Sequence, residues 1–171
     1  MKRRRPTNNR HARSATRLAV VQGLYQMDLA ATDLNVVIRD LTSHPIDESA
    51  GEEEQGAAES EDQTSRSDPI DPTFLAEMLR GVVRLQREID PMIDNQLATG
   101  WRLARVDSIL RAILRAGVYE LMDRPDAPAR VVINEYIDVA HAFLAAEDTR
   151  VVNGVLDKLA RRIRPAEFEA A

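Results

Sequence analysis

The segment from Ile133 to Arg164 reads INEYIDVAHAFLAAEDTRVVNGVLDKLARRIR and predicts two helices joined by a tight turn. Its apolar residues recur at steps of three and four on both sides of residues 145–148, so each half carries one apolar face. Asp148 is well placed to cap the second helix, where its carboxylate would accept hydrogen bonds from free backbone amides. Pro165 predicts the end of that helix.

Asn153 and Gly154 stand inside the predicted second helix. Glycine lowers helix propensity by about 1 kcal/mol relative to alanine, so its presence there needs a reason. We predict that another helix backbone packs closely against Gly154. The alternative is an open patch of backbone that a partner contacts.

Length and composition describe an ordinary soluble protein. The 171 residues suit one domain with appendages, and the absence of cysteine excludes disulfides, thiolate zinc sites and cysteine nucleophiles. No apolar run approaches the roughly 20 residues of a membrane-spanning helix. The basic start is followed by Pro6 instead of an apolar segment, which argues against a secretory signal, although an organellar transit peptide also fits such a start. We expect a cytoplasmic protein that does not bind membranes.

Charge is distributed unevenly. Residues 1–17 hold seven basic residues and no acidic one, whereas residues 44–71 hold ten acidic residues against one arginine. We predict a flexible basic arm at 1–12, a single helical domain at 13–165 interrupted by a disordered acidic insert at 45–70, and a C-terminal tail at 166–171. The insert would compete weakly with RNA for the arm, or it is only a solvated spacer.

Helical periodicity extends through the rest of the chain. Beyond the pair at 133–164, it predicts helices at 13–29, 34–41, from 72 with an apolar face through 83, 91–97 and 106–121. The three middle helices have expected start signals, which are Asp33, Asp71-Pro72 and Asp90-Pro91. No segment alternates as a strand does, so the fold class is all-α with about six or seven helices.

The sequence contains no recognisable catalytic constellation. It lacks the phosphate-binding, dinucleotide-binding, zinc-protease and serine-hydrolase motifs. Its three histidines have no carboxylate at ligand spacing around them. We therefore assign no catalytic residue, metal ligand or cofactor, and expect a protein that is not an enzyme.

The basic arm is the main functional feature. Guanidinium groups form bidentate bonds to phosphate and stack on bases, so a mobile arginine arm can grip single-stranded RNA. Aromatic residues make up only 4% of the chain, which leaves no stacking platform of the kind found on sheet-based RNA binders. A merely solubilising terminus is the alternative. The candidate RNA-binding residues are Arg3, Arg4, Arg5, Arg10, Arg13 and Arg17.

Five short patterns along the chain are informative in combination. They are Ala12-Arg13-x-x-x-Arg17-x-Ala19-Val20-x-Gln22-x-Leu24-Tyr25, Ile113-Leu114-Arg115-x-x-x-Tyr119-Glu120-Leu121, Pro128-x-x-Val131-x-Ile133-Asn134-Glu135, Glu147-Asp148, and Val152-Asn153-Gly154-Val155-Leu156-Asp157-Lys158. Together they resemble the NusB family of transcription antitermination factors. The resemblance implies two packed helical bundles and a role without catalysis. It also implies binding to the boxA element of nascent RNA together with the ribosomal protein NusE, which helps RNA polymerase read through terminators in ribosomal RNA operons.

The resemblance also implies roles for particular residues. The arginine-rich motif of the family falls on Arg13 and Arg17, although Ser14 and Ala15 replace further arginines between them. Tyr25, Glu147 and Asp148 fall in regions that the family turns towards NusE; a core tyrosine and a simple helix cap are the alternatives. A helical adaptor without RNA binding, and a NusB-like domain that serves RNA methylation, are the competing functions. A homodimer is a further possibility.

Overall fold

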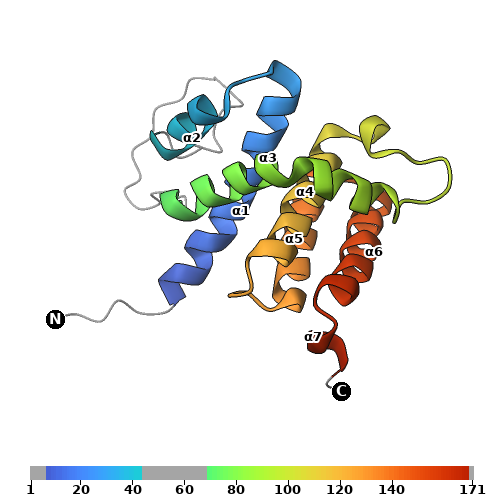
Figure 1. The fold of residues 1–171 in the computed structure, drawn as a ribbon. Helices are drawn as coiled ribbons and strands as arrows, with labels where there is room; N and C mark the ends of the chain where they lie inside the picture. Colours follow the sequence, from blue (N-terminus) through green and yellow to red (C-terminus); the bar gives the residue numbers. More distant parts are fainter. Residues whose placement is uncertain (1–6, 44–68, 170–171) are drawn as a thin grey trace, which may run out of the picture.

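The computed structural model describes residues 7–43 and 69–169, which are helical throughout apart from their connections (Figure 1). The 1–6 part of the predicted arm and nearly all of the acidic insert lie outside these residues. The elements are α1 (Thr7–Ala30), α2 (Leu34–Ser43), α3 (Pro72–Asp94), a 3-10 turn η1 (Leu103–Arg105), α4 (Ser108–Asp123), α5 (Ala129–Phe143), α6 (Ala146–Ile163) and α7 (Ala166–Glu169).

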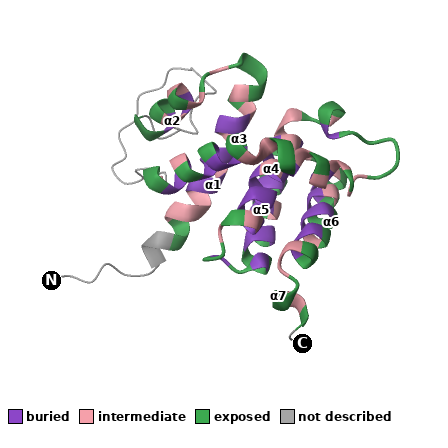
Figure 2. Cartoon of the chain, viewed as in Figure 1, coloured by how far each residue is buried: buried purple, intermediate pink, exposed green. Residues whose placement is uncertain are grey.

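The helices form two bundles that share one core. Helices α1, α2 and α3 contact one another, as do α4, α5 and α6, and α4 also packs against α1 and α3. Buried side chains from α1 through α6 join in a single apolar cluster, which includes Leu75, Ile113 and Leu156. Figure 2 shows where the buried residues lie along these helices. The predicted all-α class and the two packed bundles are confirmed. Among the described residues, no helix is long and apolar enough to cross a membrane.

Helix α1 begins at Thr7, earlier than the predicted start at Arg13, so the second half of the predicted arm is helical. Once the packed part of a helix exists, each added residue costs little, and the helix extends beyond its apolar face. Thr16 ties this end of α1 to the residue that caps α3. Its hydroxyl donates to the carbonyl of Ala12 at 2.6 Å and accepts from the amide of Asp71 at 2.9 Å.

Helix α3 confirms one start signal and contradicts the other. The Asp71 side chain accepts from the amide of Phe74 at 3.0 Å and caps the helix, as predicted. The predicted second start at Asp90-Pro91 is wrong, because Pro91 lies inside α3. Ile89 and Ile93 are both fully buried around it, and this burial offsets the amide hydrogen bond that proline lacks. Asp90 instead forms an ion pair with Arg115 on α4 at 2.8 Å.

Helix α6 corrects two predictions. It begins at Ala146 with no side-chain cap, so Asp148 lies in the first turn and is not the cap. Gly154 is exposed, and a Cβ added there would meet no atom within 4 Å, so the predicted close packing is wrong and the backbone there is open. Contact of this open backbone with a partner stays a prediction. Close packing occurs at Gly117 instead, where an added Cβ would lie 2.9 Å from Leu156 on α6.

The predicted tail is part of the fold as far as Glu169. Helix α7 places Glu167 so that its carboxylate accepts from the amide of Ala129, the first residue of α5, at 2.6 Å. Just before α7, the Arg164 guanidinium donates to four backbone carbonyls at the end of α4 and in the turn that follows. They belong to Glu120, Leu121, Arg124 and Ala127.

Candidate functional site

The first half of α1 carries three of the predicted RNA-binding arginines, in three different environments. Arg10 is exposed, Arg13 has a side chain that is 31% exposed, and Arg17 is buried at 3%. The spacing does not explain this difference, because residues three and four apart share one face of a helix. The neighbours of each turn explain it: Arg17 lies against Glu120 of α4, whereas Arg13, one turn earlier, meets Asp126 in the turn after α4. Arg3, Arg4 and Arg5 lie outside the described residues.

Arg17 forms a buried ion pair with Glu120 of α4. Its Nε lies 2.9 Å from Glu120 Oε2, and the hydroxyl of Tyr136 donates to that same oxygen at 2.9 Å. Burial would lower the pKa of Arg17, but the hydrogen bond and charge of Glu120 outweigh it and raise the pKa above its usual value. Arg17 is therefore charged and engaged in the core. Its direct contact with RNA stays a prediction, and this conformation does not present it to solvent.

Arg13 is held at the surface by an aromatic ring and a carboxylate. Its guanidinium lies 5.3 Å from the centre of the Phe74 ring, and Nη1 bonds to Asp126 at 2.6 Å. Arg17 and Arg124 lie against the same ring at 5.5 and 5.2 Å. Burial would raise the pKa of Asp126, but the hydrogen bond from Arg13 and the charge of Arg124 lower it overall. The cluster fixes the direction in which Arg13 points.

The residues predicted to face a protein partner lie at the other end of α4. Tyr25 is half-buried on α1, one turn before Asp28, whose carboxylate bonds to Arg111 in the first turns of α4 at 2.8 Å. Asp148 lines a hollow together with Leu110, also near the start of α4, while Glu147 beside it is exposed. Arg17 contacts Glu120 near the end of α4, and Asp28, further along α1, contacts Arg111 near the start of α4, so the two helices are antiparallel. The predicted RNA-binding residues of α1 therefore lie at one end of α4, and the residues predicted to face a protein partner lie at the other.

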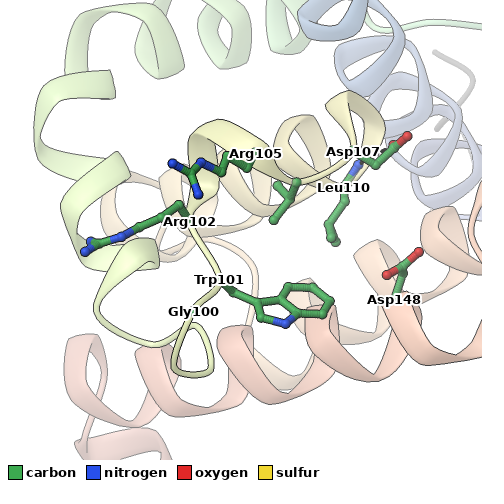
Figure 3. Close-up of a pocket in the computed structure, with 8 residues that line it drawn as sticks. Gly100, Trp101, Arg102, Arg105, Asp107, Leu110 and Asp148 are labelled. Carbon is green, nitrogen blue, oxygen red and sulfur yellow. Dashed lines mark hydrogen bonds between the residues drawn. The ribbon is translucent and has the colours of Figure 1, made fainter.

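The hollow beside Asp148 has a volume of about 300 Å³ and lies between the loop before α4 and the start of α6 (Figure 3). Trp101, Leu110 and Asp148 surround its centre, and Arg102 and Arg105 line its edge on the side of the loop away from Asp148. Trp101 is 44% exposed. The sequence analysis missed it; the only signal was a single tryptophan next to a glycine outside every predicted helix.

The described residues place charged and aromatic groups at the two ends of α4. Within 7–43 and 69–169, no group of three histidine, aspartate or glutamate side chains could hold a metal ion. What the geometry does provide is a row of guanidinium groups at one end of α4 and an aromatic hollow at the other. Phe74, Asp126 and Trp101 could not be placed there from the sequence, because they come from separate elements that meet only in the folded chain.

Comparisons with known proteins agree with this architecture. The NusB family model matches residues 14–161. The transcription antitermination protein NusB of Rhodopseudomonas palustris strain HaA2 is 48% identical over 165 residues, which cover 95% of this chain and 90% of that protein. The Nitrobacter hamburgensis protein of the same name is 47% identical over 156 residues, 91% of this chain and 90% of that protein.

Solved structures show the same fold. A NusB structure from T. maritima superposes with a TM-score of 0.69 at 26% identity and covers 92% of this chain and 96% of that one. A structure of the antitermination factors NusB and NusE in complex with dsRNA gives a TM-score of 0.64 and covers 90% of this chain and 98% of that one. Its identity is 19%, so this second likeness supports the fold alone.

Proposed function

Because this chain belongs to the NusB family, we propose that it is a non-enzymatic transcription antitermination factor that binds nascent RNA in the cytoplasm. The observation that carries the proposal is the family match over residues 14–161, which begins directly after Arg13 and includes Arg17 of α1. The named relatives are antitermination proteins, and the exposed guanidinium groups fit the phosphates of an RNA strand.

In this proposal the basic arm and the start of α1 hold single-stranded boxA RNA. Arg10 is exposed at the surface, while Arg13 is oriented by Phe74 and Asp126. A phosphate would compete with Asp126 for Arg13, which is a modest cost because the pair is partly exposed. Arg17 positions α1 against α4 from inside, and the outer arginines then meet the RNA.

A protein partner completes the complex at the other end of α4. Tyr25, Glu147 and Asp148 are proposed to face the ribosomal protein NusE, as the family resemblance implies. Two acidic side chains in the first turn of α6 suit a basic partner such as a ribosomal protein. The assembled complex then acts on RNA polymerase.

Transcription in vitro tests this function. A template with boxA upstream of a terminator is transcribed by RNA polymerase with NusE, with and without the protein. We expect read-through to rise only when both the protein and an intact boxA are present, and a template with scrambled boxA is the control. Equal read-through from both templates would contradict the proposal.

A variant separates RNA binding from an adaptor role. Arg10→Gln combined with Arg13→Gln removes the two outer guanidinium groups of α1 without touching the buried Arg17. We expect reduced read-through that recovers at higher protein concentration. Unchanged RNA affinity and unchanged read-through would favour a protein adaptor that does not hold RNA through α1.

A further inference from the structure

The loop between α3 and α4 holds Trp101 in a fixed and exposed position. The amide of Leu103 donates to Asp94 at 2.7 Å, and the carbonyl of Leu103 accepts from Arg111 at 2.9 Å. Gly100 adopts a φ of +88°, which L side chains rarely adopt, and this turn directs the chain outward at Trp101. An aromatic ring that is 44% exposed on a tethered loop is already organised for a ligand.

The chemistry around the ring matches a nucleotide. The indole offers a flat stacking face, and Asp148 lies across the hollow with no side-chain hydrogen bond to another described residue (Figure 3). Its carboxylate can accept from the exocyclic amino group that A, C and G carry, so this inference turns Asp148 towards RNA and leaves Tyr25 and Glu147 on the NusE side. Arg102 and Arg105 are exposed and pair with no acid among the described residues, so they are available to phosphates.

We propose that this hollow is a second RNA-contact site, which takes one unpaired base of the strand whose other part the arginines of α1 hold. The inference rests on the proposed RNA-binding function and adds a site to it. A volume of about 300 Å³ is at the lower end of the range of about 300–1,000 Å³ for small-ligand pockets, as a single nucleoside requires. A protein partner is the alternative occupant. Its basic side chain could contact Trp101 and Asp148, but it would not account for the exposed Arg102 and Arg105 beside them.

The geometry sets the length of RNA that reaches both sites. The arginines lie at the end of α4 and the hollow at its beginning, and a helix of 16 residues is about 24 Å long. At a spacing of about 3.4 Å for stacked nucleotides, this distance corresponds to about seven nucleotides. An RNA of about four nucleotides would occupy one site, and one of about twelve would occupy both.

Trp101 itself reports on the proposed contact, because it is the only tryptophan of the chain. We expect a boxA RNA of about twelve nucleotides to quench its fluorescence as the base stacks. In a series of RNAs that each lack one base, a single position should abolish the quenching and weaken the affinity. This arm uses the unaltered protein and leaves the phosphate charges unchanged.

Substitutions provide the second arm, with affinity measured by the anisotropy of labelled RNA. Trp101→Ala should weaken binding about 5- to 150-fold, the usual contribution of one stacked base, whereas Trp101→Phe should retain most of the affinity. Val131→Ala, at an apolar residue of equal 44% exposure, is the matched control and should change nothing. Thermal unfolding checks that each variant is folded.

The outcomes distinguish this site from the function on which it rests. If the Trp101→Ala variant binds RNA as tightly as the unaltered protein, and RNA does not quench the fluorescence of the unaltered protein, the proposed base site is wrong. RNA binding itself then stands. If that variant loses affinity only for NusE, the hollow is a protein interface and the inference is overturned. If the unaltered protein binds no RNA, with or without NusE, both proposals fail.

Discussion

Arg17 was predicted to bind RNA at the surface, but in the structure it is buried in an ion pair with Glu120. Their side chains are 3% and 1% exposed, and Tyr136 completes the hydrogen bonding of the carboxylate. Removing one partner of a buried ion pair leaves an unpaired charge, which costs about 3–5 kcal/mol. We expect Glu120→Gln to lower the free energy of unfolding by about this amount, as measured by urea denaturation.

An exposed ion pair is the control for this prediction. Asp126 pairs with Arg13 at side-chain exposures of 43% and 31%, so Asp126→Asn should cost less than about 1 kcal/mol. If the two substitutions had equal effects on unfolding, the burial of the Arg17–Glu120 pair would not matter as described.

Two glycines in neighbouring helices should respond to the same substitution with opposite signs. Gly154 faces open space, so Gly154→Ala should stabilise the protein by up to about 1 kcal/mol through helix propensity. Gly117 lies against Leu156, so Gly117→Ala should destabilise it by about 1–3 kcal/mol. Melting temperatures of the two variants test the pair. A lower melting temperature for Gly154→Ala would mean that its surface is occupied.

At the scale of elements, Arg164 joins α6 to the end of α4. Its side chain is 10% exposed, and one guanidinium serves four carbonyls. Hydrogen bonds that involve a charged group contribute about 1.5–3 kcal/mol, so we expect Arg164→Ala to lower the free energy of unfolding by about 3 kcal/mol. Arg162→Ala, two residues earlier and exposed, is the control and should stay within about 0.5 kcal/mol of the unaltered protein. Similar effects of both would contradict this bracing role.

Local signals predicted most elements but not all of their ends. The apolar period of 106–121 and of 133–164 was sufficient, because a helix that buries one face must repeat it every three to four residues. Asp71 capped its helix as predicted. Pro91 and Asp148 misled, because the buried Ile89 and Ile93 carry α3 through the proline and the backbone of Ala145 begins α6 without a side-chain cap.

The candidate site was less predictable than the fold. Clustered charge indicated Arg10 and Arg13, but the same pattern also named Arg17, whose burial depends on Glu120 more than one hundred residues later in the chain. No pattern in the sequence indicated that Phe74 would lie against Arg13 or that Trp101 would line the hollow. Contacts between distant elements decide which arginine meets solvent, and no local pattern contains that information.

For the whole molecule, the central claim is that the basic arm and the start of α1 bind the phosphates of an RNA strand. The variant that tests it replaces Arg3, Arg4, Arg5 and Arg10 by glutamine. We expect the slope of log affinity against log salt to flatten by about 0.7 for each phosphate contact that is lost on single-stranded RNA. Affinity at low salt should fall together with the slope.

The most direct measurement compares this variant with one of equal net charge. The control replaces four exposed arginines elsewhere, namely Arg39, Arg80, Arg87 and Arg162, by glutamine. Both variants are titrated with the same boxA RNA at several salt concentrations. The account predicts a flattened slope for the first variant and a nearly unchanged slope for the control. Equal slopes for both variants and for the unaltered protein would contradict RNA binding by the basic arm and the start of α1.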